Sequence, residues 1–340
     1  MFEMRKKFFF YLGVSLYLLS SCINAGELDK GIALYNQHKF IQAITIIENE
    51  ARHGNSEAQY YLGRMYEFGE GKKRNLKKSF YWYSQGAKQG NRKAQNNLAS
   101  LYADGEGVKK NQKKAIELYT LSAEQGTAAA QFNLGMMYRE GEGTERDYVR
   151  AVNLFRQAAS QDHTGAIYAL GLAYQLGMGV PVDLNEAVKW YKKAAEKGDT
   201  SSMWNLSTIY LPEDDPSDAN RWDEVYKWYA LGMEHGDRKN APFGMGLIYL
   251  FGRGHYPIDN QKAAELFTLS AENGKVDSWY WLGVMEEYGF GRPYNTEKAF
   301  ELYRKAAALG SGPAIRRLNM KEPDPTVKLF HFVKDLFEPQ

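Results

Sequence analysis

The residue with the most specific chemistry in this 340-residue chain is its single cysteine, Cys22. A basic cluster, Arg5-Lys6-Lys7, and an apolar run from Phe8 to Leu19 precede it. The run is shorter than the roughly 20 residues that span a bilayer, and a basic segment followed by a short apolar one is typical of a secretory signal. We therefore expect residues 1–21 to be a signal peptide and the chain to be exported.

The stretch Leu19-Ser20-Ser21-Cys22 resembles the lipobox of bacterial lipoproteins, in which the cysteine becomes the lipidated first residue. The resemblance implies lipidation at Cys22 and a periplasmic, outer-membrane-anchored lipoprotein, so that a membrane is one of its partners. Cleavage after Ala25 is the alternative and gives a soluble periplasmic or secreted protein. In both cases no second cysteine remains to form a disulfide.

No other residues form a pattern that is typical of catalysis. A nucleophilic enzyme needs an activated Ser, Thr or Cys with a base in reach, and the sequence has no Gly-x-Ser-x-Gly and no His-Glu-x-x-His. Glu213, Asp214, Asp215 and Asp218 gather carboxylates, but their spacing does not match an EF-hand, so we expect a solvated acidic loop. We predict that the protein is not an enzyme and has no catalytic residue, no metal site and no cofactor.

A sequence repeat organises the rest of the chain. The pair Leu62-Gly63 recurs at a fixed spacing as Leu98-Ala99, Leu134-Gly135, Leu170-Gly171 and Leu206-Ser207, and then after two longer steps as Met245-Gly246 and Leu282-Gly283. A period of 20 to 50 residues indicates a solenoid or array of small units instead of one large core.

Each repeat predicts two helices joined by a glycine loop. The first helix carries Ala166, Leu170 and Ala173 on one face, with Gly171 where close helix contact demands a small residue. A Gly-x-Gly loop follows, as in Gly177 to Gly179, and the second helix begins after an Asn or Asp cap. The predicted caps are Asn75, Asn111, Asp147, Asp183, Asp259 and Asn295. Glycine ends most second helices, Asp162 being the exception.

Histidines and aromatic residues also recur in the repeats. His53, His163 and His235 lie beside the end of a second helix, where a cation would favour the helix C-terminus. The aromatic column of the first helix is expected to pack in the core. Its members are Tyr60, Phe132, Tyr168, Trp204, Phe243 and Tyr280.

The ordered motifs Ala-x-x-x-Leu-Gly-x-x-Tyr, Gly-x-Gly, Asp, Lys-Ala and Trp-Tyr-x-x-Ala-Ala resemble the Sel1-like repeat family, a glycine-rich relative of the tetratricopeptide repeat. The resemblance covers about residues 28–318 and implies an all-α, right-handed superhelical solenoid of stacked antiparallel helix pairs, of about eight units plus a C-terminal capping helix. It also implies a protein-protein interaction scaffold or adaptor of the bacterial envelope. Two alternatives stay open: a periplasmic immunity protein that neutralises a secreted toxic effector, such as a type VI phospholipase, and, more distantly, β-lactamase or penicillin-binding activity.

The chain is expected to divide into a signal peptide at 1–21, an N-terminal cap repeat at 22–54, the repeat array at 55–310 and a C-terminal capping region at 311–340. The sixth repeat replaces its glycine loop by residues 211–222, in which Pro212 and Pro216 prevent a continuous helix. The tail restarts at Asp324-Pro325, a helix-start signal, and then carries Val327, Phe330, Val333 and Phe337 at helical spacing.

The partner-binding surface is expected on the first helices, at positions just after the Leu-Gly pair. By analogy with tetratricopeptide units, these positions vary freely and line the concave face. The predicted partner-binding residues are Arg64, Glu67, Met136, Arg139, Leu172 and Gln175, with Trp204 and Asp214 beside the sixth-repeat loop.

Charge argues against nucleic acid as a partner. The formal net charge of +2 arises from Arg5, Lys6 and Lys7 against Glu3, so the rest of the chain is close to neutral. Two basic runs lie one repeat apart, Lys72-Lys73-Arg74 with Lys77-Lys78 and Lys109-Lys110 with Lys113-Lys114. They form either a basic edge that meets anionic lipid or an acidic protein, or ordinary solvated loops.

Overall fold

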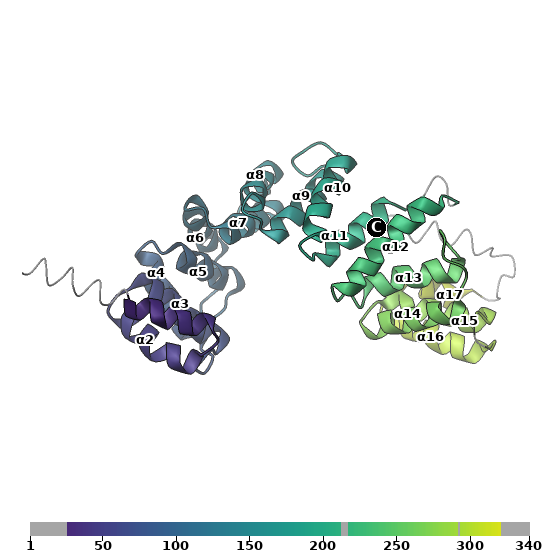
Figure 1. Ribbon diagram of the computed structural model, residues 1–340, viewed down its shortest axis with the longest axis horizontal. Coiled ribbons are helices and arrows are strands. Elements are labelled where there is room, and N and C mark those ends of the chain that lie inside the picture. Colours follow the sequence, from purple (N-terminus) through teal and green to yellow (C-terminus); the bar gives the residue numbers. More distant parts are fainter. Residues whose placement is uncertain (1–25, 212–216, 292, 321–340) are drawn as a thin grey trace, which may run out of the picture. The chain divides into compact units, whose positions relative to one another are not determined.

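The structure is a computed structural model, and it describes residues 26–211, 217–291 and 293–320 (Figure 1). Helices joined by short loops make up these residues, and no strand occurs among them. Within residues 40–159 and within residues 184–319, each helix packs against the next one. The predicted all-α class of stacked helix pairs is confirmed. The predicted signal peptide, Cys22, Asp214 and the tail at 321–340 lie outside the described residues.

The chain forms two compact parts, which we call the N-terminal part (up to residue 166, with 178–180) and the C-terminal part (167–177, and from 181 onwards). After a helix over residues 26–36, the N-terminal part contains α2 (Phe40–Arg52), α3 (Ser56–Phe68), α4 (Leu76–Lys88), α5 (Arg92–Asp104), α6 (Gln112–Glu124), α7 (Ala128–Glu140) and α8 (Tyr148–Ala159). Helix α9 (Thr164–Leu176) contributes residues to both parts.

The C-terminal part continues the same alternation of first and second helices. It contains α10 (Leu184–Ala195), α11 (Thr200–Ile209), α12 (Ala219–Glu234), α13 (Asn240–Phe251), α14 (Asn260–Glu272), α15 (Val276–Tyr288), α16 (Thr296–Ala308) and α17 (Gly312–Asn319). Helix α12 begins at Ala219 after an Asp218 cap, so the predicted loop over 211–222 is too long. Its last four residues are helical because the Asp218 side chain accepts the backbone N–H of Arg221.

The predicted caps of the second helices are confirmed at all six positions. At Asn75, for example, the side chain accepts the backbone N–H of Lys78, three residues into the helix. The same bond recurs at Asn111, Asp147, Asp183, Asp259 and Asn295. These bonds satisfy N–H groups that a helix start otherwise leaves without a partner.

The first helices have caps that the sequence analysis missed, at Asn55, Asn91 and Asp199. His163 acts as the cap of the first helix α9, because its Nδ1 accepts the backbone N–H of Ala166 at 3.2 Å. Burial lowers the pKa of His163, and its ring stacks on Phe132. The expectation of a helix-end cation is therefore wrong for His163, since a nitrogen that accepts a hydrogen bond carries no proton.

The glycine of the Leu-Gly pair lies against an aromatic ring of the second helix. A Cβ added at Gly63 would lie 2.5 Å from Cδ1 of Tyr83, whose side chain is fully buried. Similar contacts occur between Gly135 and Phe155 and between Gly283 and Tyr303. The prediction that close helix contact demands these glycines is confirmed.

The loop between the two helices of a repeat contacts the preceding repeat. Gly107 has a φ of 70°, and a Cβ there would lie 2.5 Å from the carbonyl oxygen of Leu76, the first residue of α4. Glycine is needed at this position for two reasons, since the conformation is left-handed and the neighbouring backbone leaves no room. Each such loop therefore fixes where the previous second helix begins.

Candidate protein-binding face

The positions predicted to bind a partner form one face of α3, α5 and α7, which we call the polar first-helix face. It comprises Arg64, Glu67 and Phe68 of α3, Ser100 and Asp104 of α5, and Met136, Arg139 and Glu140 of α7. All of these side chains are at least partly exposed.

Tyrosines of the second helices extend between the first helices to this face. The Tyr83 hydroxyl of α4 donates to Oε2 of Glu67 at 2.5 Å and accepts the Asn97 side-chain N–H at 2.9 Å. Burial raises the pKa of the Glu67 carboxyl. One hydroxyl thus joins three helices, α3, α4 and α5, from within the core.

These contacts extend into a chain of hydrogen bonds toward α7. Asn96 donates to Asn97 at 2.9 Å, and Asn133 donates to Asn96 at 3.4 Å. Tyr119 of α6 hydrogen-bonds Ser100 and Asn133. Since the hydroxyls of Tyr83 and Tyr119 are both used in this way, their hydrogen bonds restrain the inner side of the polar first-helix face.

The sequence analysis did not predict the asparagines that form these hydrogen bonds, although a recurring spacing in the sequence indicates them. Asparagine follows a second-helix tyrosine by 14 residues in three pairs: Tyr83 and Asn97, Tyr119 and Asn133, and Tyr191 and Asn205. Where the ring is phenylalanine, the partner is apolar, as in Phe155 with Ala169 and Phe267 with Trp281. In these pairs a hydroxyl and its polar partner occur together, whereas Tyr229 has Phe243 at that spacing and hydrogen-bonds Ser207 instead.

Glu67 and Gln175 also contact the core, because each accepts a hydrogen bond from a buried tyrosine. Gln175 accepts from Tyr191 at 2.6 Å in the C-terminal part, and Glu287 accepts from Tyr303 there at 2.6 Å. Glu67 and Gln175 are thus held by hydrogen bonds within the fold, and their role in binding a partner stays a prediction.

Arg64 is the predicted residue with the most distinctive surroundings. Its guanidinium lies 5.7 Å from the ring centre of Tyr35 and 5.4 Å from that of Phe68, and it hydrogen-bonds the Tyr60 hydroxyl. Its Nε is buried and has no hydrogen-bond partner among the described residues. Phe68 beside it is 58% exposed. An arginine that is fixed beside an exposed aromatic ring can bind a hydrogen-bond acceptor and an apolar group of a partner at the same time.

The structure does not bring the other predicted residues to Arg64. Arg139 pairs with Glu140 at 2.7 Å on α7, beside the half-buried Met136, and α5 lies between α3 and α7 in the chain of hydrogen bonds. Leu172 is half-buried in the C-terminal part.

The aromatic column packs in the core as expected. Each member lies against the aromatic ring of its own second helix with 5.5 to 6.1 Å between ring centres, as Tyr60 does on Tyr83 and Tyr280 on Tyr303. Trp204 does the same with Tyr229 at 5.6 Å, and Lys275 covers it at 5.4 Å. Its role as a binding residue stays a prediction.

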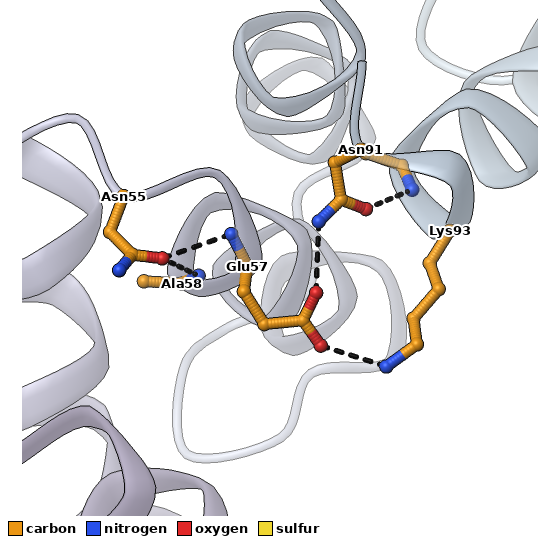
Figure 2. A network of polar contacts seen from close by, with 6 residues as sticks. Asn55, Glu57, Ala58, Asn91 and Lys93 are labelled. Carbon is orange, nitrogen blue, oxygen red and sulfur yellow. Dashed lines mark hydrogen bonds and ion pairs between the residues drawn. The ribbon is translucent and has the colours of Figure 1, made fainter. Parts of the chain in front are cut away.

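Polar contacts also join neighbouring repeats at the starts of their first helices. Figure 2 shows Asn55 capping α3, and Glu57 reaching to the next repeat. The Glu57 carboxylate accepts the Asn91 side-chain N–H at 2.9 Å and the Lys93 ammonium at 2.7 Å. Burial opposes the charge of Lys93, but Glu57 outweighs it and raises the lysine pKa. This contact sets the register of α3 against α5.

The two basic runs are partly neutralised. Lys72 pairs with Glu48 at 2.6 Å, and Arg74 lies 3.8 Å from Glu106. Lys73, Lys77, Lys109, Lys110 and Lys113 are exposed on loops and helix starts. Whether this edge binds anything stays a prediction.

The described residues also bear on two other kinds of site. None of their helices combines the length and the apolar character that crossing a membrane requires. In the same part of the chain, no three His, Cys, Asp or Glu side chains gather as metal ligands would.

The Sel1 repeat pattern matches six stretches of the chain, at residues 56–91, 92–127, 128–163, 164–199, 240–275 and 278–311. Among curated proteins, DAP3-binding cell death enhancer 1 of Rattus norvegicus is 43% identical over 61 residues, which are 18% of this chain. The chain spans only 12% of that relative's length.

Two solved structures share the arrangement of helices. One is a Sel1 repeat protein from Oxalobacter formigenes, with a TM-score of 0.65 and 30% identity over 72% of this chain and 99% of that one. The other is c5321, a protective antigen of uropathogenic Escherichia coli strains displaying an SLR fold, with a TM-score of 0.71 and 32% identity. The second comparison covers 81% of this chain and 58% of that one.

Proposed function

Because the chain belongs to the Sel1 repeat family, whose members are generally non-enzymatic protein-interaction scaffolds, we propose that it binds a partner protein on its polar first-helix face. The observation that carries this proposal is the group formed by Arg64, Tyr35 and Phe68. Binding energy at interfaces concentrates on arginine and aromatic side chains that are already held in place. This group has both kinds of residue, and its Phe68 ring is exposed.

The setting of the proposed interaction is the bacterial envelope. The predicted signal at 1–21 and the lipobox-like stretch ending at Cys22 support an exported lipoprotein of the outer membrane. One acyl chain alone holds a protein weakly, so full lipoprotein acylation would be needed for stable anchoring. The partner is then an envelope component or a secreted effector.

Affinity capture tests the proposal. Residues 23–340 are immobilised and exposed to the envelope and secreted fractions of the source organism, and retained proteins are identified and then titrated with the purified bait. Arg64→Ala and Phe68→Ala should each weaken binding by about 2 kcal/mol, roughly thirtyfold. Tyr81→Ala is the matched control, because Tyr81 is a 53%-exposed aromatic residue on the second helix α4 and should have no effect.

The identity of the retained protein distinguishes the two biological roles. A single toxic enzyme that is inhibited on binding would establish the immunity role, and an assembly or signalling protein would establish the scaffold role. If Tyr81→Ala weakens binding and Arg64→Ala does not, the polar first-helix face is the wrong surface. Hydrolysis of a chromogenic β-lactam at an enzyme's rate would replace the proposal by the enzymatic alternative.

A further inference from the structure

Lys275 directly precedes the first helix α15, at the position where other first helices have a side-chain cap. Asn91 and Asp199 at this position accept a backbone N–H of their own helix, whereas the Lys275 side chain makes no such bond. Its ammonium instead lies 4.8 Å from the ring centre of Phe243 in α13 and 5.4 Å from that of Trp204 in α11. We call Lys275, Trp204 and Phe243 the Lys275 site.

The Lys275 ammonium has no carboxylate partner among the residues that the structure describes. The two carboxylates that act on it most are engaged elsewhere. Asp237 accepts three backbone N–H groups at the start of α13, at 2.8 to 3.0 Å. Asp277 accepts the Ser311 hydroxyl at 2.8 Å. The Lys275 site therefore holds a cation without a counter-ion.

The surroundings of Lys275 disfavour its charge. Burial lowers the pKa of Lys275, and the cation of Lys239 lowers it further. Asp277 and Asp237 act in the opposite direction but do not reverse the shift. The aromatic rings attract the ammonium, but they do not replace the hydrogen bonds that a carboxylate provides. A carboxylate brought to this site would therefore stabilise it.

Lys93 in the N-terminal part shows the same arrangement with its carboxylate present. Its ammonium lies 5.4 Å from the ring centre of Tyr60 and 5.8 Å from that of Tyr61, and it pairs with Glu57 at 2.7 Å. Burial opposes the charge of Lys93 as well, but the pKa is raised because Glu57 is there. The two sites thus differ in one component, and the Lys275 site lacks it.

The Lys275 site is open to an outside group. Lys275 and Trp204 are both partly exposed, whereas Phe243 is buried. A carboxylate can reach the ammonium from this side, and an apolar group next to it would then contact the Trp204 ring. Charge and surface at this site both fit an acidic side chain that has an apolar neighbour.

We propose that the Lys275 site binds an acidic side chain of a partner protein, with the carboxylate paired to Lys275 and the neighbouring apolar group on Trp204. This contact gives Trp204 a specific binding role. It rests on the proposed function only in taking the partner to be a protein. It needs no contribution from Arg64 or the polar first-helix face.

Nuclear magnetic resonance of the chain with ¹³C at the lysine Cε atoms tests the proposal. The Lys275 signal is the one that Lys275→Arg removes. The probe is the peptide N-acetyl-Leu-Glu-Leu-amide, and N-acetyl-Leu-Gln-Leu-amide is its uncharged match. Followed by the Lys275 signal at pH 7, the Glu peptide should bind about tenfold more tightly than the Gln peptide. It should also raise the pH at which Lys275 titrates.

Lys93 provides the matched control within the same sample. In the unchanged chain its signal should not respond to the Glu peptide, because Glu57 already occupies the ammonium. Glu57→Gln removes that carboxylate at nearly constant size, so Lys93 should then titrate at lower pH and respond as Lys275 does. A Lys275 signal that responds equally to both peptides, or to neither, would overturn the proposal. An equal response of Lys93 in the unchanged chain would do so too, because it would show non-specific pairing.

A partner obtained by affinity capture separates this proposal from the proposed function. Lys275→Gln should weaken its binding about tenfold. Binding that is weakened by Arg64→Ala and not by Lys275→Gln would overturn the Lys275 site alone. The reverse result would support the Lys275 site and contradict the polar first-helix face.

Discussion

The hydroxyl of Tyr83 lies 2.5 Å from Oε2 of Glu67 and donates to it from inside the helical core. The tyrosine ring is fully buried, and the carboxylate stands at the border of the polar first-helix face. The hydrogen bond from the Tyr83 hydroxyl favours the charged form of Glu67, whereas burial of the carboxyl disfavours that form. This balance has consequences for stability.

Glu67→Gln should make stability less dependent on pH. Burial raises the pKa of Glu67 above its usual 4.5, although the bond from Tyr83 opposes the rise, so the folded chain binds the proton more tightly than the unfolded chain. Stability from this group is then complete below about pH 4.5 and is lost as the pH rises through the folded-state pKa. Gln keeps an acceptor for Tyr83, as Gln175 does for Tyr191.

Urea denaturation at pH 4 and pH 7 measures this effect. Relative to the unchanged chain, Glu67→Gln should gain stability as the pH rises, and Tyr83→Phe should lose about 1 kcal/mol through the missing hydrogen bond. An equal difference between Glu67→Gln and the unchanged chain at both pH values would show that burial does not disfavour this carboxylate.

Gly63→Ala should destabilise the chain by about 1 to 2 kcal/mol, because the added methyl group meets the Tyr83 ring at 2.5 Å. The ring has no room to move, since its hydroxyl is bonded on both sides. Gly312→Ala is the matched control: the nearest atom to its Cβ is Nη1 of Arg316 at 3.6 Å, so it should be neutral or stabilising. Thermal unfolding compares the two, and equal effects would remove the packing explanation.

Asp162→Gly should stabilise the chain by up to about 1 kcal/mol, because Asp162 has a φ of 62°, a conformation that glycine adopts without steric cost. Glycine takes this conformation at the other second-helix ends. The reverse change, Gly126→Asp, should destabilise by a similar amount, since no atom lies within 4 Å of its added Cβ and only the backbone is strained. Opposite shifts of the unfolding midpoint would support this reason, and shifts of the same sign would exclude it.

Cys22→Ser should move the protein from the membrane fraction to the soluble fraction of the source organism, if Cys22 carries the lipid as proposed. Labelling with a fatty acid should then be lost as well. The control is Ser21→Ala, which keeps a small residue before the cysteine and should leave both results unchanged. A soluble unchanged chain that takes up no fatty acid would exclude the lipobox interpretation in favour of cleavage after Ala25, and labelling that persists in Cys22→Ser would place the lipid on another residue.

The helices, their glycines and the caps of the second helices were predictable because each depends on residues close together in the chain. Asn75 caps a helix that begins one residue later. The need for glycine at Gly63 can be recognised because the residue lies on the apolar face of a pattern with the helical period of 3.6 residues. Local signals also failed where two interpretations compete. His163 looks like a helix-end cation, yet it serves the start of the next helix.

The hydrogen bonds of the candidate face were not predictable from local patterns. Tyr83 bonds to residues 16 positions before and 14 positions after it, which lie in neighbouring helices of a stack. Only the repetition of the spacing within the chain reveals them. Arg64 was predicted as a binding residue, but its place between Tyr35 and Phe68 depends on how the first repeat packs on the second.

The contact of Gly107 with the start of α4 has a consequence for how such chains arise. Gly143 meets Gln112 at the start of α6 in the same way, and Gly291 meets Asn260 at the start of α14. A gene segment that encodes one whole repeat can therefore be copied or lost, and the new neighbours will still fit through the same glycine. Inheritance can therefore change the length of this protein in whole repeats while these contacts between neighbouring repeats are kept.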